Sequence, residues 1–211
     1  MKLIQNFHNH SLHSCDSACA EITDIIAEMN MHGVQEFGLT DHLHTALNLP
    51  DIVSARRDFL SSEPPANFHF GVEVSVVDQK ECERIAARDW PPQDDDPVYG
   101  FRDMKDYTGR FAIDLREENI RDLGIEYVVG GIHWPLCCFD GKAKMIEHYL
   151  ALHLYLVEHP LVDILAHPWD SLERAAGGWF ERRDKEHIDY GIFPCIPGEY
   201  NECLAESLVK Q

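Results

Sequence analysis

Apolar residues recur along the chain with two periods, one typical of strands and the other of helices. Short apolar runs predict strands at "KLIQNFH", "VQEFGLTDH", "NFHFGVEVSVV", "IEYVVGGIHW" and "LVDILAHPWD". Between them lie stretches whose apolar residues stand three and four apart, as in residues 18–33, where Gly33 predicts the end of a helix. Strands that alternate with helices indicate βαβ units and a parallel sheet, so the pattern predicts an α/β fold.

One domain accounts for the whole pattern. The chain has 211 residues, 45% of them hydrophobic, which is enough for one buried core. Further helices are predicted at 51–62, 79–88, 113–124, 142–158 and 198–211. The stretch "DWPPQDDDPVYG" interrupts the rhythm, but strands and helices resume after it. We therefore predict a single domain over residues 1–211, with a loop insertion around residues 89–112.

Polar residues that can bind metals stand at the end of every predicted strand. They are His8, His10, Asp41, His42, Glu73, His133 and His167. In a (β/α) barrel the strand ends meet at one face, where the chemistry takes place. Each residue alone has an ordinary explanation, such as a surface pair or a helix cap. Glu73 is more telling, because a carboxylate inside an apolar run is costly unless it is paired or coordinated.

Together these residues predict a metal site. Imidazole and carboxylate ligands suit zinc, iron or manganese. Residues His8, His10, Asp16, His42, Glu73, His133 and His167 are too many for one four-coordinate ion. The count therefore indicates a site with more than one ion.

Charge and cysteine content narrow the partners and the location. Asp and Glu outnumber Lys and Arg by 37 to 18, which gives a formal net charge of −19. This charge repels phosphate backbones and disfavours nucleic acid as a partner. A small phosphorylated substrate stays open, because bound metal ions reverse the field locally. The seven cysteines include no CxxC pair, and we expect them to be reduced thiols. The sequence has no signal-like or membrane-spanning run, so we expect a cytoplasmic protein.

The order of these motifs resembles the PHP (polymerase and histidinol phosphatase) family of metal-dependent phosphoesterases. The matching features are HxH, an aspartate six residues later, "TDH", a glutamate in a strand, a strand ending in "IH", and "AHP". The size and the insertion are more similar to the histidinol-phosphatase branch than to the polymerase domain. The resemblance implies a distorted (β/α)₇ barrel with two or three divalent transition-metal ions.

The resemblance also implies a ligand set. His8, His10 and Glu73 would hold one ion, and Glu73 would bridge to a second ion on His133 and His167. Asp16 and His42 would hold a third. His13 falls between the matching positions and is expected to be a supporting or loop histidine.

One part of the family pattern is not present. The family closes with a late Asp-x-His, and this sequence contains none. The barrel is therefore expected to be incomplete at its C-terminal end, with His187, Asp189 and Glu199 as candidate substitute ligands.

The predicted activity is hydrolysis of a small phosphomonoester by a hydroxide that bridges two ions, with Asp41 orienting a ligand imidazole. A phosphodiesterase or exonuclease of the same family and a non-catalytic metal-binding barrel remain alternatives. A metal-dependent amidohydrolase also uses HxH, but it usually adds a bridging lysine, and no strand end here carries one.

Overall fold

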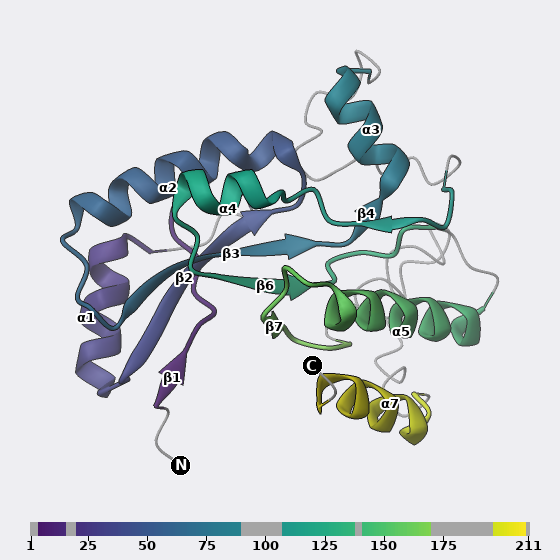
Figure 1. The fold of residues 1–211 in the computed structure, drawn as a ribbon. Coiled ribbons are helices and arrows are strands. Elements are labelled where there is room, and N and C mark those ends of the chain that lie inside the picture. Colours follow the sequence, from purple (N-terminus) through teal and green to yellow (C-terminus); the bar gives the residue numbers. More distant parts are fainter. Residues whose placement is uncertain (1–3, 16–19, 90–106, 138–140, 170–195, 210–211) are drawn as a thin grey trace, which may run out of the picture.

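A parallel sheet organises the chain (Figure 1). The computed structural model describes residues 4–15, 20–89, 107–137, 141–169 and 196–209. The main sheet has the order β1-β2-β3-β6-β7, and every neighbouring pair is parallel. Its strands are β1 (Gln5–Asn6), β2 (Glu36–Leu43), β3 (Phe68–Ser75), β6 (Tyr127–Gly131) and β7 (Ile164–Leu165).

Helices follow the strands and cover the sheet (Figure 1). Within the described residues there are six α-helices, namely α1 (Ile22–His32), α2 (Leu49–Ser61), α3 (Gln79–Ala87), α4 (Glu117–Leu123), α5 (Lys142–Glu158) and α7 (Gly198–Val209). A short 3₁₀ helix, η1 (Ala46–Asn48), precedes α2. As predicted, Gly33 caps the end of α1: it follows His32 and adopts the left-handed φ of 63°.

The sheet is curled into an open half-barrel (Figure 1). The α/β class and the parallel sheet are confirmed. Within the described residues β1 and β7 form the two edges, and the closed seven-stranded barrel stays a prediction. None of the helices in the described ranges is long and apolar enough to cross a membrane.

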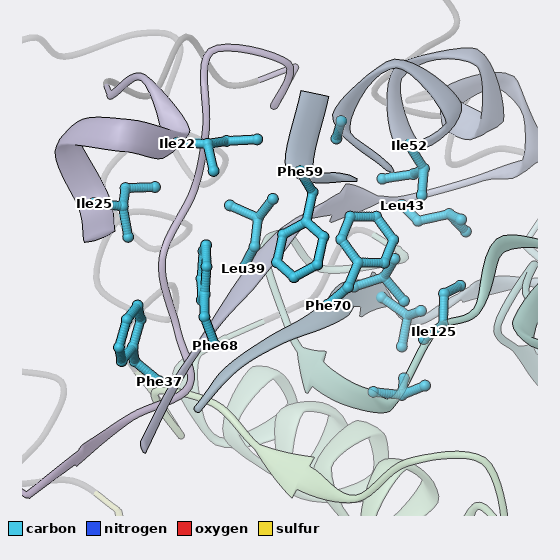
Figure 2. Packing of buried hydrophobic residues seen from close by; sticks show 14 of the residues in the cluster. Ile22, Ile25, Phe37, Leu39, Leu43, Ile52, Phe59, Phe68, Phe70 and Ile125 are labelled. Carbon is cyan, nitrogen blue, oxygen red and sulfur yellow. The ribbon is translucent and has the colours of Figure 1, made fainter. Parts of the chain in front are cut away.

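The face of the sheet toward α1 and α2 carries the larger hydrophobic cluster (Figure 2). Strand side chains alternate between faces, so Phe37 and Leu39 on β2 and Phe68 and Phe70 on β3 point to the same side. Phe59 of α2 packs against both β3 phenylalanines, with ring centroids 4.9 and 5.3 Å away. Truncating one such buried ring to alanine costs about 3–5 kcal/mol, so this cluster fixes the strands in place.

The concave face is filled at one end by Tyr127. Its hydroxyl donates hydrogen bonds to the carbonyl oxygens of Phe7 (3.0 Å) and Leu39 (3.2 Å). Gly38 and Gly71 leave the space for its ring, because a Cβ at either position would overlap the phenol. The side chain of Tyr127 thus occupies the concave face before the carboxyl ends of β2 and β3. The carboxyl ends of the strands are left for polar side chains.

The predicted insertion contains one element that the sequence pattern did not indicate. Its last residues form β5 (Phe111–Ala112), which pairs antiparallel with β4 (Val77–Asp78). Residues 90–106 lie outside the described part. The predicted strand "NFHFGVEVSVV" is correspondingly divided, because its last residues leave the main sheet to form β4.

Candidate metal centre

Six of the predicted ligand residues meet at the carboxyl ends of the strands. They are His8, His10, His42, Glu73, His133 and His167. His8 and His10 follow β1, His42 and Glu73 lie in β2 and β3, and the last two histidines follow β6 and β7. The main sheet therefore contributes at least one ligand-type residue from each of its five strands. This convergence could hold metal ions.

Glu73 lies at the centre of the cluster, and its two carboxylate oxygens face different histidines. Oε2 lies 2.9 Å from Nε2 of His8, 3.4 Å from Nε2 of His10 and 3.1 Å from Nδ1 of His42. Oε1 lies 3.2 Å from Nε2 of His133 and 3.0 Å from Nε2 of His167. The side chain of Glu73 is fully buried, so its surroundings are set by these imidazoles. The arrangement gives the carboxylate two separate sides.

Asn9 places the first two histidines. Its backbone carbonyl accepts a hydrogen bond from the backbone N–H of Thr40 (2.8 Å), and its side-chain amide donates to the carbonyl of Gly38 (2.8 Å). Asn9 is thereby tied to β2 by both backbone and side chain. The residues on either side of it, His8 and His10, then both reach Glu73, as the HxH spacing predicts for an extended segment.

Gly131 makes room for the other side of the cluster. A Cβ at this position would stand 2.9 Å from Cε1 of His133 and 3.2 Å from Cε1 of His167, and it would overlap Oε1 of Glu73.

The backbone of His167 has a φ of 25°, and that of Trp169 has a φ of 72°, a region that residues other than glycine rarely adopt. Such backbone conformations are concentrated at functional sites.

The electrostatics of Glu73 favour its charged form. Burial on its own would raise the pKa of the carboxyl group, but hydrogen bonds from His133, His167 and His8 outweigh burial and hold the pKa well below its usual range. The carboxylate therefore stays ionised at neutral pH and presents a negative charge inside the protein.

The five imidazoles around Glu73 are better explained as metal ligands than as hydrogen-bond donors to the carboxylate alone. A carboxylate offers roughly four lone-pair sites, fewer than the five imidazole nitrogens gathered within 3.4 Å of Glu73. If every ring were protonated, five positive charges would surround one negative charge, which is costly at a buried site. Neutral imidazoles bind zinc, iron or manganese through their lone pairs and remove this conflict. With bonds of about 2.0–2.2 Å, two ligands on one tetrahedral ion stand about 3.4 Å apart, close to the spacing found here.

Possible ligand atoms fall into three groups in the described residues, each with its atoms within 4.8 Å of one another. The groups are His8, Glu73 and His167; His10, His42 and Glu73; and His42, His44 and His133. His42 lies beside Glu73 and His10, and the third ion expected on Asp16 and His42 stays a prediction. Asp16 itself lies outside the described residues, as do His187 and Asp189. Glu199 is exposed near the start of α7 and belongs to none of the three groups.

Asp41 and His13 have partners outside the cluster. Asp41 is buried, and its carboxylate accepts hydrogen bonds from the backbone N–H and hydroxyl of Ser11, both at 2.6 Å. Burial raises the pKa of Asp41, while the Ser11 bonds oppose the rise. The residue thus secures the chain next to His10, and its expected part in orienting a ligand imidazole stays a prediction. His13 is hydrogen-bonded to Asp58 of α2, with Nε2 2.7 Å from Oδ2, as expected for a loop histidine.

Two polar residues of the site were not predicted. His44 and Ser75 are almost fully buried, and the imidazole of His44 lies against those of His42 and His133. Residue parity is the signal that would have found them. His44 is two residues after His42, and Ser75 is two residues after Glu73, so each shares the face of its ligand neighbour.

Comparisons with known proteins add no relative. A scan against protein-family models, a search of curated proteins and a search of solved structures each found no match. The interpretation of the cluster therefore rests on its residues and their geometry.

Proposed function

We propose that the protein is a metal-dependent phosphoesterase that hydrolyses a small phosphomonoester. The observation that supports this most directly is the division of Glu73, whose Oε2 faces three imidazoles and whose Oε1 faces two others. One carboxylate with ligands on both sides suits a pair of neighbouring divalent ions. The PHP-like order of motifs supports the choice of a phosphate ester as substrate.

The residues of the chain have separate tasks in this proposal. His8, His10 and His42 would supply ligands on the Oε2 side, and His133 and His167 would supply ligands on the Oε1 side. The possible ligand atoms of His8, His167 and Glu73 also lie within 4.8 Å of one another, so these three residues could share an ion across the two sides. Ions bound there would lower the pKa of water and neutralise charge on the phosphoryl oxygens of the substrate. Glu73 stays ionised and keeps a negative charge between the two sets of histidines.

The surroundings of the cluster keep it in place. Asn9 ties the HxH segment to β2, and Asp41 holds Ser11 directly after it. The formal charge of −19 favours a small substrate over a long nucleic acid, because repulsion grows with the number of phosphates that approach the surface.

Metal content and substrate preference together test the proposal. The purified chain is stripped with a chelator and reconstituted separately with zinc, manganese and iron, and bound metal is counted by elemental analysis. We expect at least two ions per chain and hydrolysis of p-nitrophenyl phosphate that disappears on chelation. Glu73→Gln, which keeps the side chain's shape and removes its charge, should lose both. His13→Ala is the matched control, because it alters a histidine of the same segment that contacts Asp58 instead.

The alternatives give different results. Faster hydrolysis of bis-p-nitrophenyl phosphate than of the monoester would indicate a phosphodiesterase. Two bound ions with no turnover of either ester would indicate a metal-binding barrel without phosphoesterase activity. Less than one ion per chain under all three metals would refute the metal centre itself.

A further inference from the structure

A line of hydrogen bonds extends from the candidate metal centre into the protein. Oγ of Ser75 lies 2.7 Å from Nδ1 of His133 and 2.7 Å from Nδ1 of His44. The serine and His44 are 1% and 2% exposed, so solvent does not compete for these contacts. The serine hydroxyl therefore links an imidazole that faces Glu73 to one farther from it.

The two nitrogens of His133 have different surroundings. Nε2 lies 3.2 Å from Oε1 of Glu73, and Nδ1 lies against Ser75. A neutral imidazole has one N–H and one lone pair. If Nε2 offers its lone pair to an ion, Nδ1 carries the proton and donates it to the serine oxygen. The hydroxyl of Ser75 then donates to Nδ1 of His44, which keeps its own proton on Nε2. This order makes both contacts hydrogen bonds while Nε2 of His133 remains a ligand. In the other order Ser75 would accept from Nδ1–H of both rings, and Nε2 of His44 would then offer its lone pair to an ion in a group with His42 and His133.

His44 is held firmly enough to act as the end of this line. Its backbone N–H donates to Oδ1 of Asn48 (3.1 Å). Its ring stacks on that of His42, with centroids 4.6 Å apart, and meets the ring of Trp134 edge to face at 4.8 Å. A ring held by these contacts presents Nδ1 toward Ser75.

We propose that Ser75 and His44 are positioning residues that fix the tautomer and the ring orientation of His133. The inference rests on the metal centre of the proposed function and adds to it a determinant of metal affinity on the Oε1 side of Glu73. A ligand histidine usually donates its other N–H to a neighbouring acceptor, and loss of that acceptor typically costs about 10–100-fold in metal affinity. Here the acceptor is a serine whose own proton is taken by a second histidine.

Cobalt binding tests the inference without relying on catalysis. The chelator-stripped protein is titrated with Co²⁺, and affinity, stoichiometry and the visible absorption bands of the cobalt are recorded. We expect Ser75→Ala to bind its weakest ion about 10–100-fold less tightly, with altered bands and an unchanged number of ions at saturation. Ser75→Thr, which keeps the hydroxyl, should bind more tightly than Ser75→Ala. His44→Phe keeps the ring contacts and leaves the serine able to accept from His133, so its loss should be smaller than that of Ser75→Ala.

The outcomes separate this inference from its rivals. If His44→Phe removes one ion at saturation while Ser75→Ala does not, His44 is itself a ligand and the positioning role is refuted. Equal affinities and spectra for Ser75→Ala and the unaltered protein would also refute it. A correctly folded protein that binds no cobalt would refute both the inference and the metal centre. Cobalt binding that responds as expected, in a protein that hydrolyses no phosphate ester, would support the positioning role and leave only the proposed activity wrong.

Discussion

Gly131→Ala is the smallest change that should destroy the candidate metal centre. The added Cβ would stand 2.9 Å from Cε1 of His133 and would overlap Oε1 of Glu73. Ordinary carbon–carbon contacts are about 3.5–4.0 Å, so the His133 ring would have to retreat by at least about 0.6 Å. Metal–ligand distances tolerate deviations of only about 0.2 Å. One methyl group therefore moves ligands on the Oε1 side out of range of an ion.

The expected result has two parts. Overpacking should lower the free energy of unfolding of the metal-free protein by about 1–3 kcal/mol. Metal affinity should fall at least about tenfold, because the His133 and Glu73 ligand atoms no longer reach a shared ion. Urea unfolding of the metal-free protein measures the first quantity, and titration with Zn²⁺ followed by calorimetry measures the second.

Gly130→Ala is the matched control. It is the preceding residue of β6, and its Cβ would point to the opposite face, 3.0 Å from both Cδ2 of Leu156 and Cγ1 of Val162. It should cost a similar amount of stability and leave the affinity for zinc unchanged. The reasoning would be refuted if Gly131→Ala bound zinc as tightly as the unaltered protein. It would also be refuted if the two variants lost zinc affinity equally.

Three further changes have measurable outcomes. Glu73→Ala should release at least one ion, as counted by elemental analysis, whereas His13→Ala should keep them all; equal metal contents would refute the ligand assignment. The ring of His69 donates hydrogen bonds to the carboxylates of Glu126 and Glu36, which raise its pKa above the ordinary 6.5. This histidine should therefore stabilise the fold below pH 6.5 and lose that contribution as the pH rises through its folded-state pKa. Urea unfolding of the unaltered protein and His69→Gln at pH 6 and pH 9 should show a difference at pH 6 only, of less than about 1 kcal/mol because the pair is partly exposed. Tyr127→Phe leaves two carbonyls without the phenol hydroxyl and should cost about 1–3 kcal/mol in thermal unfolding, and an unchanged midpoint would contradict this.

Sequence periodicity predicted the framework of the fold because each element buries a continuous apolar face. The two-residue periodicity in β2 and β3 and the helical spacing of α1 follow directly from which side chains reach the core. The pairing of β4 with β5 was not predictable in this way. Each has two residues, and more than thirty residues separate them, so neither carries a periodic signal.

The candidate ligands were predictable because parallel strands end at one edge, but their partners were not all recognised. Alternation places His44 beside His42, and the same rule places Asp41 on the opposite face, where it accepts from Ser11. Which of these residues share an ion depends on the curvature of the sheet. Curvature is a tertiary property, and a local pattern of residues does not specify it.

The chain order of the strands gives the cluster a mechanical consequence. Among the described strands β1 and β7 lie at opposite edges of the sheet, yet the rings of His8 and His167, which follow them, stack with centroids 5.4 Å apart. Metal ions held by these histidines together with Glu73 would connect the two edge strands of the described sheet. This connection would form only after β7 has paired with β6, so bound metal would stabilise the complete sheet over partly folded forms. A ligand that binds only the folded state stabilises it in proportion to the logarithm of the ligand's concentration. The free energy of unfolding of this sheet would therefore rise with the concentration of available metal.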